Sequence, residues 1–169
     1  MDEQTFDALM ASADTAMAVV TTVVDGARGG CLIGFHGQCS IDPRRYALWI
    51  SKANRTHELA VHADVFAVHL LRRQDSALAA LFGASSGDDL DRFERCDWDP
   101  GLHGVPLLAA APNRVVVRRL TMLDAGGDHT GFVTEPVEAT TAGPFTPLRL
   151  ADVSDLDPGH EPDERRHRT

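Results

Sequence analysis

Short runs of β-branched and aliphatic residues recur along this chain, and several end at a turn signal. Residues 17–24 form the first run, and Asp25-Gly26, which favours tight β-hairpin turns, follows it directly. Asp42-Pro43 and Gly126-Gly127 mark two further turns. Runs of this length and composition are typical of β-strands. We therefore expect strands over residues 17–24, 46–51, 65–71, 105–111, 113–123 and 130–140, with residues 28–40 extended but interrupted.

Helical patterns are short and lie before or between these strands. Phe6, Leu9 and Met10 have the spacing of one helix face, which predicts an amphipathic helix over residues 2–13. A second helix is expected to begin at Asn54 or Thr56, both suitable caps, and to end near residue 62. Because strands dominate, the sequence predicts a mainly β fold, a closed or partly closed barrel with a few short peripheral helices. Two further helical segments are expected over residues 74–82 and 90–93.

The composition of the chain changes after residue 150. Residues 152–169 are rich in Asp, Glu, Arg and Pro and have almost no apolar side chains. Such a segment cannot bury enough surface to offset the entropy lost on ordering. The full length of 169 residues suits one domain. We therefore expect one domain over residues 1–150, followed by a flexible charged tail over residues 151–169.

The charge balance argues against two classes of partner. Sixteen basic and 25 acidic residues give a formal net charge of -9, which disfavours a nucleic-acid groove and adsorption to anionic membranes. No segment approaches the roughly 20 apolar residues of a membrane-spanning helix, and the acidic N-terminus does not resemble a signal peptide. Cys31, Cys39 and Cys96 form an odd set without a CxxC pair. This pattern predicts reduced thiols and a cytoplasmic protein.

The first candidate site lies where an expected strand passes into an expected helix. A helix start presents unpaired N–H groups and a partial positive charge, which suit a phosphate. Two hydroxyl groups and two basic side chains add donors and charge. From spacing alone, a plain helix cap with solvated basic side chains explains the segment at least as well. The segment comprises Ser51, Lys52, Ala53, Asn54, Arg55 and Thr56.

Two other segments carry residues that suit a bound ring. His129, preceded by Gly127 and Asp128, begins an expected strand, where an imidazole titrates near neutrality or donates to a ligand; the alternative is a turn with a surface histidine. The glycines of residues 29–40 would allow the backbone to approach a planar ligand, or would simply fit a bulged barrel corner.

No metal site is predicted from the cysteines and histidines. Cys31, Cys39 and His36 do not complete a zinc-ligand set. The spacing of His57, His62 and His69 does not place two ligands on one helix face, so these side chains are expected at the surface or the edge of the core. The chain also has no P-loop, no G-x-S-x-G element and no G-x-G-x-x-G after a strand.

In their order, these segments resemble the flavin reductase-like family, whose members fold as FMN-binding split barrels. The resemblance runs from about residue 6 to residue 150 and includes an S-x-D-P turn and a G-D-H element. Cys31 and Gly34 stand where many members have Thr and Ser, and Arg44 replaces the second proline of the usual D-P-P. The matching segments are residues 18–22, 40–43, 51–56, 66–71, 78–82, 91–93, Trp98 with 104–108, and 127–129.

The resemblance implies a Greek-key split β-barrel that forms a homodimer, with flavin near the subunit interface. It implies that the flavin phosphate contacts residues 51–56 and that His129 lies near the flavin ring and an incoming nicotinamide. Residues 31–34 and 38–40 would flank the isoalloxazine. The predicted catalytic residue is His129, and the predicted cofactor-binding residues are Cys31, Leu32, Ile33, Gly34, Gln38, Cys39, Ser40, Ser51, Lys52, Ala53, Asn54, Arg55, Thr56 and Asp128.

The resulting hypothesis is an oxidoreductase that uses NADH or NADPH to reduce FMN, or alternatively FAD, and supplies reduced flavin to a monooxygenase component. A second hypothesis is a flavin-binding carrier or sensor without reductase activity, which the altered residues Cys31 and Gly34 would suit. A third is a related split barrel that uses a deazaflavin or haem, and a fourth is a plain interaction domain.

Overall fold

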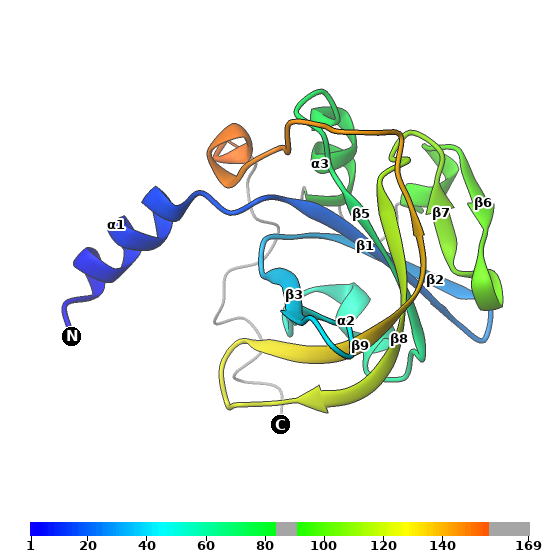
Figure 1. Ribbon diagram of the computed structural model, residues 1–169, viewed down its shortest axis with the longest axis horizontal. Helices are drawn as coiled ribbons and strands as arrows, with labels where there is room; N and C mark the ends of the chain where they lie inside the picture. Colours follow the sequence, from blue (N-terminus) through cyan, green and yellow to red (C-terminus); the bar gives the residue numbers. More distant parts are fainter. Residues whose placement is uncertain (84–90, 156–169) are drawn as a thin grey trace.

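The computed structural model describes residues 1–83 and 91–155, in which seven strands form one antiparallel sheet. The strand order is β2-β1-β5-β8-β9-β4-β3, so strands far apart in the sequence, such as β1 and β5, lie side by side. The sheet curls on itself into a half-barrel (Figure 1), which confirms the predicted mainly β split-barrel fold. Its strands are β1 (Ala18–Val24), β2 (Ala27–Ile33), β3 (His36–Ser40), β4 (Arg45–Ser51), β5 (Val65–Leu70), β8 (Arg114–Leu123) and β9 (His129–Thr140).

A separate two-stranded sheet replaces one of the expected strands. The sequence predicts an extended segment over residues 105–111, but β7 covers only Pro106–Leu108 and pairs with β6 (Trp98–Pro100) instead of joining the large sheet. The prediction is wrong in extent because the chain turns directly after β7, where the Ala111 N–H donates to the Leu108 carbonyl oxygen at 3.2 Å.

The expected helices are present, and α2 begins at the predicted cap. Asn54 is the N-cap of α2, so the choice between Asn54 and Thr56 is settled. Helix α2 packs against β2, while α1 projects away from the barrel and buries none of its side chains (Figure 1). The helical turn expected over residues 90–93 is a 3-10 turn, and Leu90 lies outside the described residues. The helices are α1 (Glu3–Ala13), α2 (Arg55–Ala60) and α3 (Ser76–Gly83), with 3-10 turns at Arg92–Glu94, Leu102–Gly104 and Leu150–Val153.

Two hydrophobic clusters lie on opposite faces of the central strands. Val20 and Phe66 belong to the cluster inside the half-barrel, whereas Val19 packs with Phe82 of α3 on the outer face. Successive side chains of a strand point to opposite faces, so β1 is buried on both sides. This double burial explains why the first run in the sequence is almost continuously apolar instead of alternating.

His69 is a core residue, which makes the prediction of a surface or core-edge position wrong. Its side chain has no exposed surface, because β5 is covered on both faces. The Leu108 N–H donates to His69 Nε2 at 3.0 Å, and His69 Nδ1 lies 3.1 Å from the carbonyl oxygen of Val19. Burial lowers the pKa of His69 to about 4. The neutral imidazole therefore links β1 to the β6–β7 sheet through these two hydrogen bonds.

The packed part of the chain continues slightly beyond residue 150. The turn Leu150–Val153 is anchored by a hydrogen bond from the Ala151 N–H to the Asp14 carboxylate at 2.9 Å, and Val153 is buried. The charged tail expected over residues 151–169 therefore begins with an ordered turn. Its residues 156–169 lie outside the described residues.

Candidate functional site

The ends of β4 and β9 bring two of the predicted segments together. Ser51, the last residue of β4, is paired in register with His129, the first residue of β9. The Lys52 N–H then donates to the carbonyl oxygen of Asp128 at 2.8 Å. The segment 51–56 and the Gly-Asp-His element are therefore direct neighbours, although their separation along the chain gave no sign of it.

The start of α2 is fixed by local hydrogen bonds and by contact with β2. The Asn54 side chain accepts from the Thr56 N–H at 2.9 Å, and the Ala53 N–H donates to Ser51 Oγ at 3.3 Å. Thr56 is buried over β2, where a Cβ added to Gly29 would lie 3.2 Å from Thr56 Cγ2. A glycine at position 29 therefore lets the helix start approach the strand closely.

A cavity of about 520 Å³ opens beside this helix start, between the β1–β2 hairpin and the turn Arg92–Glu94. Arg55 and Thr56 line it together with the backbone of Gly29 and Gly30. Among the described residues, three guanidinium groups and two carboxylates line the cavity, so this part of its lining carries a net positive charge. A phosphate suits such a lining, because arginine forms charge-assisted hydrogen bonds with its oxygens. The charged residues are Arg28, Arg55, Arg92, Glu58 and Asp91.

The arginines of this cavity are held by specific contacts. Arg28 forms an ion pair with Asp91 at 3.0 Å, and its guanidinium lies 5.0 Å from the centre of the Trp98 ring. Arg92 Nη1 donates to the carbonyl oxygen of Gly30 at 3.2 Å. These contacts keep positive charge along β2 beside the cavity.

The side chains of residues 31–33 in strand β2 pack into the two hydrophobic clusters. Cys31 and Ile33 point into the barrel core, and Leu32 packs on the opposite cluster. Burial raises the pKa of the Cys31 thiol to about 12, so this group stays a neutral core residue. Sequence alternation alone does not reveal which of these side chains face inward.

One backbone edge of β2 faces away from β1, and at Gly30 this edge is buried and its carbonyl oxygen accepts from Arg92. In the described part of the chain β2 pairs with β1 alone. The hairpin closes on a two-residue turn, in which Asp25 and Gly26 both have positive φ. From the turn onward, hydrogen-bonded and non-hydrogen-bonded residue pairs alternate along the hairpin, beginning with the hydrogen-bonded pair Val24 and Ala27. Gly30 and Leu32 belong to non-hydrogen-bonded pairs, so their N–H and C=O groups point away from β1.

The His129 side chain is oriented by a carboxylate and an aromatic ring. Its Nδ1 lies 2.8 Å from Asp128 Oδ1, and its ring meets Phe35 edge-on with the ring centres 5.1 Å apart. Phe35 is 59% exposed, and the sequence does not predict it as a site residue. Its position directly after Gly34, in the interrupted stretch between two strands, is the signal that would have indicated it.

Polar contacts surround the His129 end of β9. Lys52 forms an ion pair with Asp124 at 2.9 Å, and its hydrogen bond lowers the pKa of the Asp124 carboxyl. Next to His129, the Thr130 hydroxyl lies 2.8 Å from His57 Nε2. These contacts tie α2 to β9 and fix the residues that flank His129.

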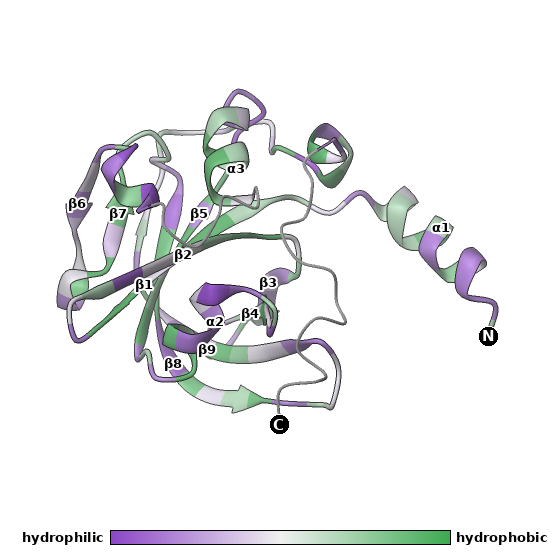
Figure 2. Cartoon of the chain, turned by 180° about the vertical axis from the view of Figure 1, so that it is seen from behind, coloured by the Kyte–Doolittle hydropathy of each residue, from purple (hydrophilic) through white to green (hydrophobic). Residues whose placement is uncertain are grey.

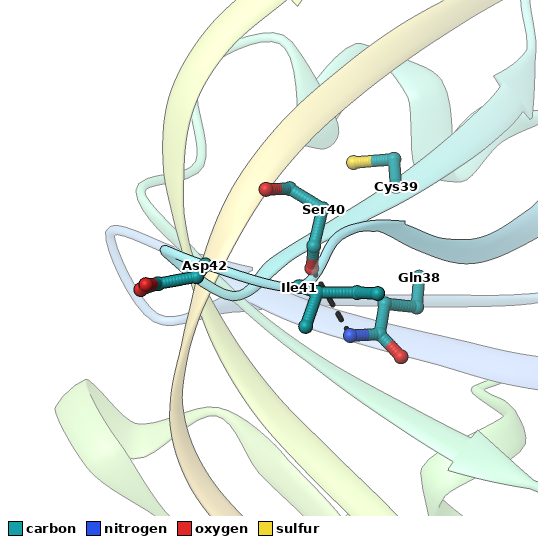
Figure 3. A pocket seen from close by; sticks show the side chains of 5 residues that line it. All are labelled: Gln38, Cys39, Ser40, Ile41 and Asp42. Carbon is teal, nitrogen blue, oxygen red and sulfur yellow. Dashed lines mark hydrogen bonds between the residues drawn. The ribbon is translucent and has the colours of Figure 1, made fainter.

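Gln38, Cys39 and Ser40 lie apart from the arginine-lined cavity. They line a separate open hollow of about 620 Å³ with Ile41 and Asp42. Figure 3 shows these five side chains. The Gln38 side chain donates to the carbonyl oxygen of Ser40 at 3.0 Å, which occupies its amide within this hollow. Within residues 1–83 and 91–155, the two hollows share no lining residue.

The described residues contain no group of three His, Cys, Asp or Glu side chains placed to hold a metal ion. Within the same residues, no helix has the length and apolar character needed to cross a membrane.

Comparison with known proteins gives a consistent match over most of the chain. The family model described as "Flavin reductase like domain" matches residues 10–152. An NADH:riboflavin 5'-phosphate oxidoreductase from Streptomyces pristinaespiralis is 31% identical over 87% of this chain and 82% of its own length. The reductase subunit of a flavin-dependent monooxygenase from Rhodococcus jostii is 24% identical over 76% of this chain and 64% of its own length. The solved structure of an NADH:FAD oxidoreductase from Streptomyces globisporus superimposes with a TM-score of 0.71 and 26% identity, covering 83% of this chain and 84% of that one.

Proposed function

This chain belongs to the flavin reductase-like domain family, and from that premise we propose that it catalyses the NAD(P)H-dependent reduction of FMN. The observation that carries the proposal is the pairing of Ser51 with His129, because it joins the anion-binding helix start to the Gly-Asp-His element in one site. When bound, the flavin supplies the hydride chemistry, and the protein supplies binding and orientation.

The residues present fit a flavin mononucleotide. We assign the phosphate to Arg55 and Thr56 in the positively charged cavity, with Ser51 to Asn54 shaping the loop before it. The ring would lie at the unpaired edge of β2 along residues 31–34, toward His129 and Asp128. Because the side chain of Cys31 faces the core, a hydroxyl group at this position is not needed for this arrangement. We assign Gln38, Cys39 and Ser40 to the far rim of the site.

His129 is proposed to act at the reacting end of the site. In the neutral imidazole, a proton on Nδ1 that is donated to the Asp128 carboxylate leaves Nε2 as an acceptor. This arrangement would orient the imidazole toward a bound flavin ring or nicotinamide. The imidazole would not have to take part in hydride transfer itself.

The proposal is tested by mixing the purified protein with NADH or NADPH and with FMN or FAD, then following nicotinamide oxidation. We expect turnover with FMN, and we expect His129→Ala to lower turnover more than flavin affinity. No turnover with any pair would refute reductase activity, and a yellow protein that fails to oxidise nicotinamide would instead be a flavin carrier or sensor. Equal losses of turnover and affinity in the variant would contradict the role of His129.

We also propose that the protein is a homodimer in which a second copy covers α1. Phe6, Leu9 and Met10 are exposed along one side of this helix, which carries both hydrophobic and hydrophilic stretches (Figure 2). An isolated helix of 11 residues is marginal in water, so packing against another surface would stabilise it. Light scattering should give twice the chain mass, and Leu9→Asp should weaken the dimer while Leu102→Asp leaves it unchanged. A monomeric wild type would refute this assignment.

The partner and location follow as further proposals. The relative that is a monooxygenase reductase subunit supports a monooxygenase component as the consumer of reduced flavin. The three free cysteines, of which Cys39 is exposed, support a cytoplasmic location. We propose residues 1–150, together with the packed turn Leu150–Val153, as the flavin-binding domain and the residues that follow as its charged tail.

A further inference from the structure

Phe35 is a large aromatic side chain that is exposed beside the proposed reacting centre. It lies in the short connection between β2 and β3 and is 59% exposed. Its carbonyl oxygen accepts a hydrogen bond from the Trp49 N–H at 2.9 Å, which ties this connection to β4. The exposed ring is therefore carried by a backbone segment that this hydrogen bond fixes to the sheet.

The surroundings of Phe35 combine an apolar face with a polar rim. Its ring meets the imidazole of His129 at an interplanar angle of 63°, an edge-to-face contact that fixes the two rings relative to each other. Asp128 precedes His129 in the chain and contacts its imidazole, and Lys52 lies across the β4–β9 pair, where its N–H donates to the Asp128 carbonyl oxygen. An exposed aromatic face bordered by polar groups is typical of a surface that binds a planar ligand.

We propose, on the basis of the flavin-binding function above, that Phe35 packs against the isoalloxazine ring and orients it relative to His129. Phe35 follows the outward-facing backbone of Leu32 by three residues, and because the chain bends at Gly34 and Phe35 the two are at most about 10 Å apart. A three-ring system can span this distance, so one ligand would contact both the strand edge and the phenyl ring.

The test compares flavin binding by the wild type with Phe35→Ala, Phe35→Trp and the control Leu102→Ala. Leu102 is also a partly exposed apolar residue, but it lies in the turn between β6 and β7. Loss of one aromatic contact should weaken FMN and riboflavin binding alike, by about tenfold in Phe35→Ala. Phe35→Trp should keep the affinity and quench the fluorescence of bound FMN more strongly, because indole quenches flavin on contact. The control should change neither quantity.

The outcomes separate this inference from the proposed function. If the wild type binds neither FMN nor riboflavin, flavin binding itself fails. If the wild type binds FMN while both Phe35 variants keep its affinity and fluorescence, only the role of Phe35 is overturned. The role is also overturned if Phe35→Ala changes only the KM for the nicotinamide nucleotide, or only the dimer dissociation constant measured in parallel. The tryptophan variant keeps the test decisive should the alanine variant fold poorly.

Discussion

Replacing Arg55 by Gln should separate recognition of the flavin phosphate from recognition of the ring. Arg55 is exposed at the rim of a cavity whose described lining has three guanidinium groups and two carboxylates, so the substitution removes the excess positive charge of that lining. Hydrogen bonds to charged groups contribute about 1.5–3 kcal/mol, and exposure favours the lower end of that range. A loss of about 1.4 kcal/mol corresponds to tenfold weaker binding.

Fluorescence titration with FMN and with riboflavin measures this effect, since riboflavin has the same ring and no phosphate. In Arg55→Gln we expect the Kd for FMN to rise by about tenfold and the Kd for riboflavin to stay within about twofold. Added salt should weaken FMN binding less in the variant than in the wild type. Arg73→Gln, at a 71% exposed side chain outside the cavity, is the matched control. Equal losses for both ligands, or no loss for either, would refute phosphate binding at Arg55.

Two further predictions concern the fold that supports the site. The pKa of His69 is about 4 in the folded protein and 6.5 in the unfolded chain, so this group should leave stability unchanged above pH 6.5 and lower the free energy of unfolding by about 3 kcal/mol as the pH drops to 4. Urea unfolding across this pH range should show a weaker pH dependence in His69→Gln than in the wild type. The same pH dependence in both proteins would contradict the assignment. A Cβ at Gly30 would lie 2.7 Å from the buried Phe82 ring, so Gly30→Ala should cost about 1–3 kcal/mol of unfolding free energy. Gly37→Ala, where the added carbon meets nothing within 4 Å, should cost much less, and similar losses in the two variants would show that crowding is not the cause.

Local features of the fold could be predicted because their causes are local. Asp25-Gly26 supplies the two positive φ angles of the hairpin turn, and Asn54 caps α2 through its own side chain. The almost continuous apolar run of β1 reflects burial on both faces. Such signals are complete within a few residues, so they can be recognised without knowledge of the rest of the chain.

Features that depend on distant contacts could not be predicted in this way. The glycines of β2 indicated close approach of a ligand, but Gly29 and Gly30 also admit α2 and Phe82, which come from elsewhere in the sequence. His69 is buried because Leu108 supplies an N–H donor, and Phe35 belongs to the site because β9 brings His129 beside it. The register of β2 determines that Cys31 faces the core, and a shift of one residue would reverse that orientation.

The central claim is that residues 51–56 and His129 form one site at which flavin is reduced by a nicotinamide nucleotide. The most direct measurement is the oxidation of NADH and of NADPH by the purified wild-type protein, with and without added FMN. We expect oxidation that depends on both FMN and the protein, and that falls sharply in His129→Ala while FMN still binds. The absence of FMN-dependent oxidation with either nucleotide would contradict the claim.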